Sequence, residues 1–174
     1  DVGPVIDDDA KAMLASHVAR LRVRGRLIAE VPMPEATRHG SYIAPIAFDI
    51  DLADLPEREV FGPVLHVIRY RIEGLENALA AIAATGYGLT LGIHSRIDAF
   101  VERVRAHLRV GNTYVNRNMI GAVVGVQPFG GEGLSGTGPK AGGPHYLHRF
   151  AVERTLTVNT AAAGGNAALL AQAE

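Results

Sequence analysis

The residues best suited to chemistry in this chain lie in a glycine-rich stretch, Gln127 to Pro144. Seven of its eighteen residues are glycine, and Phe129 is its only aromatic residue. Glycine is unfavourable in helices and strands, so this density indicates backbone with unusual dihedral angles, or backbone that a ligand approaches closely. We expect an ordered loop that wraps a site, with Phe129 pointing inward. A flexible surface loop is the alternative.

Two nucleotide-binding motifs can be weighed against this stretch. Residues 131–136 spell a literal G-x-G-x-x-G, but the dinucleotide fingerprint needs a helix that opens on its last glycine. Here no helix can begin until about Pro144, so no helix N-terminus is available to hold a pyrophosphate. A P-loop is disfavoured as well, because Lys140 lies between a proline and an alanine rather than in a Gly-Lys-Ser/Thr core.

A second candidate site is Glu59-Val-Phe-Gly-Pro63, which directly precedes a strong strand pattern. A carboxylate can accept hydrogen bonds from two hydroxyl groups, which suits a ribose diol. Phe61 lies two residues after Glu59, so in an extended chain both side chains face the same way. The alternative for Glu59 is a solvated acid at the entrance to a strand.

A third candidate is Gly121-Ala122-Val-Val-Gly125, which follows another predicted strand. Two small residues in a turn can expose successive backbone N–H groups, and such a nest binds anions. Small residues are common in turns of every kind, so Gly121 and Ala122 become a binding site only together with their neighbours.

Composition limits the classes of partner. The net charge of −1 gives no electrostatic case for nucleic acid or for an anionic membrane surface. No apolar run approaches the ~20 residues of a membrane span, and no signal peptide is evident. The chain has no cysteine, which excludes disulfides and is compatible with a cytoplasmic protein. His145 and His148 have a metal-ligand spacing but no third ligand nearby, so we expect no metal site.

Hydrophobic periodicity and breaker residues predict the elements. One domain of 174 residues is expected, with an arm, and the absent initiator Met suggests an excised or processed piece. Alternating helices and strands indicate an α/β fold with a parallel sheet. Pro45 suggests an edge position or a bulge for its strand. The expected helices are 7–25, 75–84, 97–108 and 144–152, and the expected strands are 26–31, 42–50, 64–70, 89–94, 111–116 and 154–159, followed by an Ala/Gly-rich tail, 161–174.

Taken together, these segments resemble the aldehyde dehydrogenase superfamily. Within it, the chain is similar to glutamate-semialdehyde (1-pyrroline-5-carboxylate) dehydrogenases, and more narrowly to the C-terminal part of that module in bifunctional proline utilisation A enzymes. The resemblance to the superfamily is carried by 2–7, 59–64, 88–95, 110–116 and 127–131, and the narrower one by 114–118, 121–125, 135–147 and 159–166.

The resemblance implies a role for each candidate residue. Glu59 would hold the nicotinamide ribose of NAD, and Phe61 would pack beside the nicotinamide. Gly121 and Ala122 would anchor the substrate carboxylate through their N–H groups, and Phe129 would press on the aliphatic part of the substrate. FAD would belong only to a proline dehydrogenase domain that this chain does not contain.

The resemblance also implies what the chain lacks. In this family a Cys thiolate attacks the aldehyde, a hydride passes to NAD⁺, and a Glu acts on water to hydrolyse the thioester. That Cys, that Glu and the dinucleotide-binding half all precede the position of Asp1, so no catalytic residue is expected here and the isolated chain should be inactive. The residues that would distinguish NAD from NADP are missing too.

The expected organisation is a C-terminal portion of the catalytic domain, 1–152, followed by an oligomerisation strand and tail, 153–174. Residues 154–159 alternate polar and apolar side chains, which is typical of a strand with one buried face. A terminal strand can satisfy its backbone by joining the sheet edge of a second copy, so a homo-oligomer is predicted. Two alternatives stay open: a catalytically silent oligomerisation module, and an aldehyde dehydrogenase with another substrate.

Overall fold

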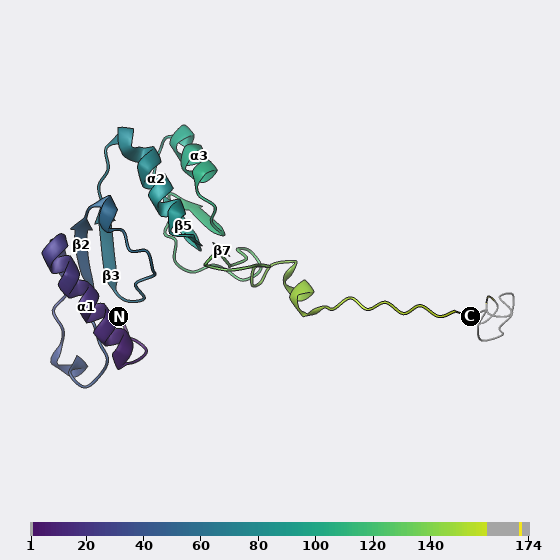
Figure 1. Cartoon of the computed structure of the whole chain (residues 1–174), viewed down its shortest axis with the longest axis horizontal. Coiled ribbons are helices and arrows are strands. Elements are labelled where there is room, and N and C mark those ends of the chain that lie inside the picture. The colour runs from purple at the N-terminus through teal and green to yellow at the C-terminus, as the bar shows by residue number, and fades with distance from the viewer. Residues whose placement is uncertain (1, 160–170, 172–174) are drawn as a thin grey trace.

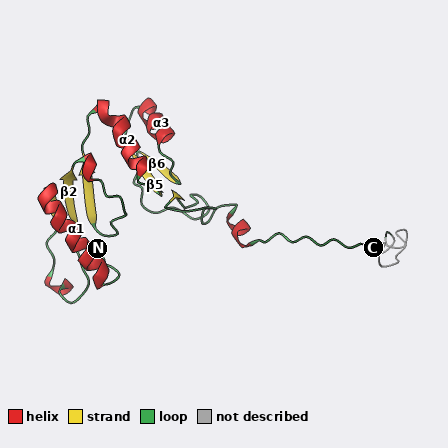
Figure 2. Cartoon of the chain, in the orientation of Figure 1, coloured by secondary structure: helices red, strands yellow, loops and turns green. Residues whose placement is uncertain are grey.

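The computed structural model describes residues 2–159 and residue 171. Two helix-and-strand units follow one another, and a looped segment and an extended arm then lead away from them (Figure 1). Figure 2 shows that the regular elements are confined to the two units and the loop, apart from one short helical turn. The elements are α1 (Asp8–Arg24), β1 (Arg26–Glu30), β2 (Ile46–Ile50), β3 (Val64–Ile68), α2 (Leu75–Ala84), β4 (Tyr87–Gly88), β5 (Thr90–Ile93), α3 (Asp98–His107), β6 (Asn112–Val115) and β7 (Glu132–Gly133).

Helix α1 begins and ends at the residues that its sequence indicates. The side chain of Asp7 accepts a hydrogen bond from the Ala10 N–H at 2.7 Å, which satisfies one of the free donors of the first turn. The Gly25 N–H closes the last turn on the carbonyl oxygen of Leu21. Leu14 and Leu21 are buried on one face, and that face packs on the first sheet.

The first sheet has the order β1-β2-β3, with β1 antiparallel and β3 parallel to β2. Ile46, Phe48 and Ile50 all point to the α1 side and are buried, which is the period-two pattern of a strand. Pro45 predicted an edge position or a bulge; the edge position is wrong, because β2 is central, whereas the register of β1 against β2 does shift between Leu27 and Ala29. Pro45 lies just before the strand, and only its carbonyl oxygen is used, as acceptor for the Val31 N–H at 2.9 Å.

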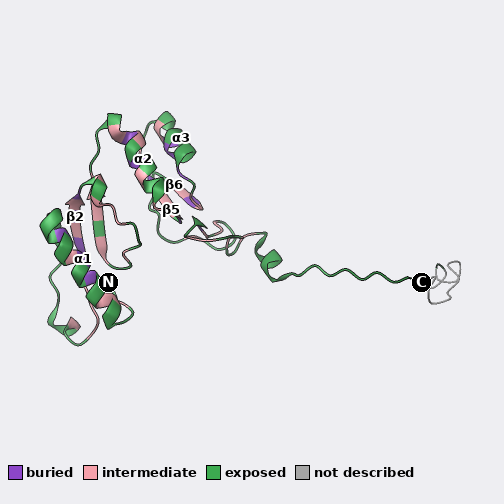
Figure 3. Cartoon of the chain, viewed as in Figure 1, coloured by how far each residue is buried: buried purple, intermediate pink, exposed green. Residues whose placement is uncertain are grey.

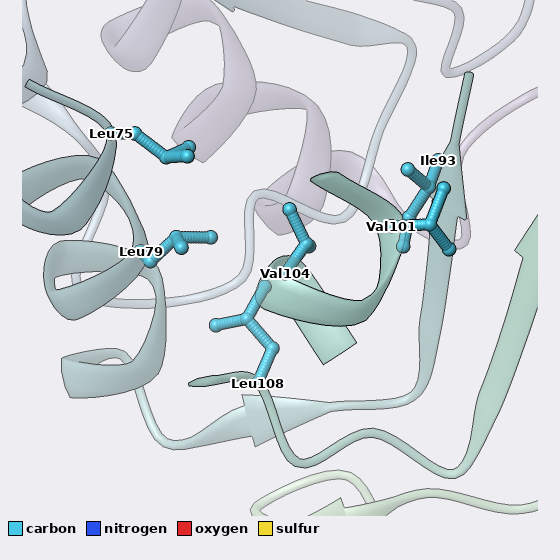
Figure 4. Close-up of a cluster of buried hydrophobic side chains, with 6 residues drawn as sticks. All are labelled: Leu75, Leu79, Ile93, Val101, Val104 and Leu108. Atoms are coloured by element: carbon cyan, nitrogen blue, oxygen red, sulfur yellow. The ribbon is translucent and has the colours of Figure 1, made fainter. Parts of the chain in front are cut away.

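The second unit is the helix–strand alternation that the sequence predicts. Strands β5 and β6 are parallel, in register from Thr90 opposite Asn112 to Ile93 opposite Val115. Helices α2 and α3 cover them, and six buried aliphatic side chains fill the space between (Figure 4). These side chains are Leu75, Leu79, Ile93, Val101, Val104 and Leu108. Burial of such side chains contributes about 1.5–3 kcal/mol each, which is the main stabilisation of this unit.

The expectation of one parallel sheet needs correction. Parallel pairs are present, but the described residues form three separate small sheets, one of them mixed. The third is an antiparallel pair in which Tyr87 and Gly88 of β4 lie opposite Gly133 and Glu132 of β7. This pair returns the glycine-rich loop to the second unit and so connects the candidate site to its core.

The C-terminal segment lies outside both cores. The expected helix 144–152 is a shorter 3₁₀ helix, Tyr146–Phe150. Residues 151–158 are extended, and none of them belongs to a described sheet. Leu156 is 87% exposed, and Figure 3 shows the whole arm as exposed. The tail 161–174 lies outside the described residues except for residue 171. The domain boundary after 152 and the pairing of 154–159 with a second copy stay predictions.

No helix within the described ranges is long and apolar enough to cross a lipid bilayer.

Candidate functional site

The segment that carries Glu59 and Phe61 is a tight turn seated on helix α1. Hydrogen bonds run from the Gly62 N–H to the Val60 carbonyl oxygen at 2.9 Å and from the Val64 N–H to the Gly62 carbonyl oxygen at 2.8 Å. The backbone is therefore not the extended strand on which the shared orientation of Glu59 and Phe61 relied. Phe61 is 75% exposed, at the centre of the first turn.

Gly62 is required by packing rather than by a ligand. A Cβ atom at Gly62 would lie 2.5 Å from Cδ1 of Leu14, a fully buried residue of α1. A side chain here would require either the Leu14 side chain or the turn to shift. The Glu59–Pro63 turn thus has a fixed position on the first unit.

The Glu59 carboxylate is exposed and forms no ion pair with any described residue. It borders a hollow of about 750 Å³ between residues 53–60 and the side of α1 that carries His17 and Arg20. A carboxylate without a cationic partner keeps its oxygen lone pairs for hydroxyl donors. The ribose-binding role of Glu59 stays a prediction.

One tyrosine connects this turn to the glycine-rich loop. The Glu59 N–H donates to the phenol oxygen of Tyr87 at 3.3 Å. The backbone of Tyr87 lies in β4, opposite Gly133 of the loop. The predicted cofactor residue and the predicted substrate loop are therefore tied to the same strand, which sequence patterns did not indicate.

Two histidines in contact, the buried His17 and the half-buried His66, lie at the first sheet, and His17 also lines the hollow. Arg20 Nη2 lies 2.9 Å from His17 Nδ1, and His17 Nε2 lies 2.8 Å from His66 Nε2. Because a guanidinium only donates, His17 Nδ1 must accept, so His17 carries its proton on Nε2 and donates it to His66. Burial lowers the pKa of both imidazoles, and the charge of Arg20 lowers both further. The helical spacing of His17 from Leu14 and Leu21 was the only sequence sign of its burial.

The glycine-rich loop is ordered by hydrogen bonds on both of its limbs. Ser135 Oγ accepts the Gly88 N–H at 3.0 Å beside the β4–β7 pair. Further on, Phe129 and Ala141 exchange two backbone hydrogen bonds, at 3.0 and 2.8 Å. The side chain of Phe129 is 39% exposed, half covered by its surroundings. These contacts fix the Phe129 backbone; its direction toward a substrate stays a prediction.

The predicted anion nest has two unused donors. Neither the Gly121 nor the Ala122 N–H donates to a described residue, and Gly121 has φ +73°, in the region that favours glycine. The next turn is closed by the Gln127 N–H on the Val123 carbonyl oxygen at 2.7 Å. This loop reaches the glycine-rich loop, where Val124 approaches Gly142.

The remaining candidates are His145 and His148. Both are exposed, and their rings contact each other edge to face with centroids 5.8 Å apart. Across the described part of the chain, no group of three or more His, Asp or Glu side chains is arranged to hold a metal ion.

Comparison with known proteins places the chain in one family. The Aldehyde dehydrogenase family profile matches residues 1–156. The chain is 53% identical over 151 residues to the bifunctional protein PutA of Rhizobium meliloti, covering 86% of this chain and 12% of that protein. It is 40% identical over 148 residues to the 1-pyrroline-5-carboxylate dehydrogenase of Geobacillus kaustophilus, covering 84% of this chain and 28% of that protein. The chain thus spans about an eighth of its PutA relatives.

The solved structures that match this chain include the same two kinds of protein. A crystal structure of proline utilization A (PutA) of Bradyrhizobium japonicum, a D779W mutant, matches with a TM-score of 0.81 and 61% identity, over 92% of this chain and 16% of that chain. A 1-pyrroline-5-carboxylate dehydrogenase from Thermus with bound NAD matches with a TM-score of 0.71 and 38% identity, over 85% of this chain and 28% of that chain.

Proposed function

Because this chain belongs to the aldehyde dehydrogenase family, we propose that it is the C-terminal portion of the catalytic domain of an NAD-dependent L-glutamate γ-semialdehyde dehydrogenase. Its relatives named PutA and 1-pyrroline-5-carboxylate dehydrogenase support that substrate. The full-length protein would be bifunctional and cytoplasmic, with FAD held by a proline dehydrogenase domain outside this chain.

The observation that carries the proposal is that two sets of accessible polar groups have no partner among the described residues. Glu59 presents a carboxylate without an ion pair in the described residues, and Gly121 and Ala122 present N–H groups that no described acceptor uses. A ribose diol would supply hydrogen-bond donors to the Glu59 carboxylate. A substrate carboxylate would supply an acceptor for the N–H groups of Gly121 and Ala122. The cofactor and a carboxylate-bearing aldehyde are the two ligands that this enzyme class requires.

Each residue then has one task. Glu59 accepts hydrogen bonds from the nicotinamide ribose, and Phe61 offers an exposed aromatic face beside the ring. NAD⁺, when bound, supplies the hydride acceptor. Gly121 and Ala122 hold the substrate carboxylate, while Phe129 packs on the methylene groups between the carboxylate and the aldehyde. The chain has no cysteine, so the nucleophile must come from another segment.

An assay of NADH formation tests the proposal. The full-length protein that contains this segment is expected to reduce NAD⁺ with L-glutamate γ-semialdehyde, and the purified 174-residue chain is expected to be inactive. Turnover by mass-verified 174-residue chain would refute the assignment of the nucleophile to another segment. A folded full-length protein that oxidises other aldehydes but not this one would refute the substrate.

A second candidate function is oligomerisation, and the extended arm supports it. Leu156 and Val158 are 87% and 65% exposed in a segment that joins no described sheet. Pairing with a second copy would bury this face and satisfy the backbone. Sedimentation of the chain and of a version ending at Val152 decides: loss of the oligomer on truncation is expected, and an unchanged oligomer would reject the arm as its cause.

A further inference from the structure

Asn112, the first residue of β6, is a buried polar side chain that grips the backbone around Phe129. Its Nδ2 donates to the carbonyl oxygen of Pro128 at 3.1 Å, and its Oδ1 accepts the Gly130 N–H at 3.4 Å. Those two groups lie immediately before and after Phe129. A side-chain amide that bonds a carbonyl and an N–H two residues apart copies the pairing of a neighbouring strand, so Asn112 holds Phe129 from one side.

Ala141 holds Phe129 from the other side, through the two backbone hydrogen bonds at 3.0 and 2.8 Å. Lys140, the preceding residue, joins the two sides. Its Nζ donates to Asn112 Oδ1 at 3.2 Å and to the carbonyl oxygen of Gly111. These hydrogen bonds form a closed ring that links Asn112 at the start of β6, residues 128–130, Ala141 and Lys140.

Lys140 has no carboxylate partner among the described residues. Its ammonium is partly buried and is satisfied by carbonyl and amide oxygens alone. Hydrogen bonds from a charged donor are shorter and stronger than neutral ones, so these contacts hold geometry tightly. Gly111, the residue before β6, also packs closely against this loop. A Cβ atom at this position would overlap the carbonyl oxygen of Gly130.

We propose that Lys140 and Asn112 are positioning residues that set Phe129 as the wall against which the aliphatic chain of the aldehyde packs. This inference rests on the proposed function for Phe129 and extends it to two residues that contact neither substrate nor cofactor. Both act through the backbone of Phe129. Substrates with a methylene chain long enough to reach Phe129 depend on the clamp, and short aldehydes do not.

A double-mutant cycle in the full-length protein tests the coupling. Lys140→Met removes the ammonium at similar length, Phe129→Ala removes the wall, and the double variant reports whether the first acts through the second. Lys140→Met is expected to raise the KM for L-glutamate γ-semialdehyde about fivefold to twentyfold, with kcat within about twofold. In the Phe129→Ala background the same change should alter KM less than about twofold.

The chain contains a matched control, because Lys11 is its only other lysine. Lys11 donates to the carbonyl oxygen of Gly40 at 3.2 Å, in the first unit and away from the loop, so Lys11→Met should leave KM unchanged. If Lys140→Met does not fold, Asn112→Asp takes its place, because it keeps the Oδ1 acceptor and loses the donor to Pro128. Independent effects of Lys140→Met and Phe129→Ala on KM would overturn the clamp.

Hydrogen exchange separates this inference from the proposed function. Lys140→Met should speed exchange of the Gly130 amide about tenfold or more, whatever substrate the protein uses. If the wild type does not oxidise the semialdehyde, the proposed function fails and the exchange result alone decides on the clamp. Unchanged exchange at Gly130 would overturn it.

Discussion

The phenol oxygen of Tyr87 accepts the N–H of Glu59 at 3.3 Å, and this contact joins the first unit to the strand that carries the glycine-rich loop. The turn around Glu59 is also held by α1, by its own hydrogen bonds and by the Ile46 N–H, which donates to the Pro63 carbonyl oxygen at 3.0 Å. The position of Glu59 relative to the proposed substrate loop therefore depends in part on the side chain of Tyr87.

Removing the phenol oxygen of Tyr87 should weaken the positioning of Glu59, the proposed cofactor-binding residue. Tyr87→Phe in the full-length protein leaves the Glu59 N–H without its acceptor, a loss of about 0.5–1.5 kcal/mol. We expect the KM for NAD⁺ to rise about twofold to tenfold, as measured by steady-state kinetics at saturating aldehyde. Tyr70→Phe, at a tyrosine that is 47% exposed, is the matched control and should have no effect. An unchanged KM in Tyr87→Phe would contradict the link.

The charge of the Glu59 carboxylate should matter more for the use of NAD⁺ than the volume of the side chain. Glu59→Gln keeps the volume but replaces a charge-assisted acceptor, whose hydrogen bonds are worth about 1.5–3 kcal/mol, with a weaker one. We expect a changed NAD⁺ dependence or a slower hydride step, measured by steady-state and single-turnover kinetics. Glu57→Gln, two residues away in the same hollow, controls for general charge. Wild-type values for both parameters in Glu59→Gln would refute the ribose role.

The proposed anion nest at Gly121 and Ala122 predicts that the enzyme prefers aldehydes that carry a carboxylate. Ala122→Pro deletes one N–H donor, and an unreplaced carboxylate contact costs about 1–3 kcal/mol. The KM for L-glutamate γ-semialdehyde should rise roughly 5- to 100-fold, and the KM for an aldehyde without a carboxylate should change far less. Ala122→Gly, which keeps the N–H, serves as control. Equal losses for both aldehydes would indicate general damage to the loop.

The lowered pKa values of His17 and His66 predict that the folded protein loses stability at acid pH. Burial and the charge of Arg20 lower the folded-state pKa of His17 and of His66, so the folded state binds protons less readily than the unfolded state. Their contribution to the free energy of unfolding is complete above the unfolded pKa of about 6.5 and is lost as the pH falls below it.

Urea unfolding at about pH 8 and about pH 5 measures this loss. The double variant His17→Gln, His66→Gln should lose less stability between the two pH values than the wild type, because it has no imidazole to protonate there. His94→Gln, at an exposed histidine, should behave like the wild type. An identical pH dependence in wild type and double variant would contradict the prediction.

Local signals in the sequence predicted the elements well. Asp7 and Gly25 are short-range signals for the two ends of a helix, and the structure has that helix. The β-rich stretch 42–50 contains a strand, but this strand begins only at Ile46. The mixed first sheet was not predicted, because the direction of β1 relative to β2 depends on the path of residues 31–45 rather than on the strand itself. Pro45 did not mark an edge strand, because it lies immediately before β2 and so removes no hydrogen-bond donor from the strand itself.

The candidate site was predictable only in part. Glycine density, Glu59 and the small residues at 121–122 are visible in the sequence. The contacts that hold them are not, because Tyr87 and Asn112 reach their partners across 28 and 16 residues. A tyrosine or asparagine at such a distance carries no local pattern. These positioning residues emerge only when tertiary contacts are known.

The most direct measurement replaces the matching segment of Rhizobium meliloti PutA, to which this chain is 53% identical, by residues 1–156 of this chain. If the segment is the C-terminal portion of a glutamate-semialdehyde dehydrogenase site, the chimaera forms NADH from L-glutamate γ-semialdehyde with kcat/KM within about tenfold of the unmodified protein. Glu59→Gln in the same chimaera lowers that value. A folded chimaera with no semialdehyde-dependent NADH formation, beside an active unmodified protein, would contradict the proposed function.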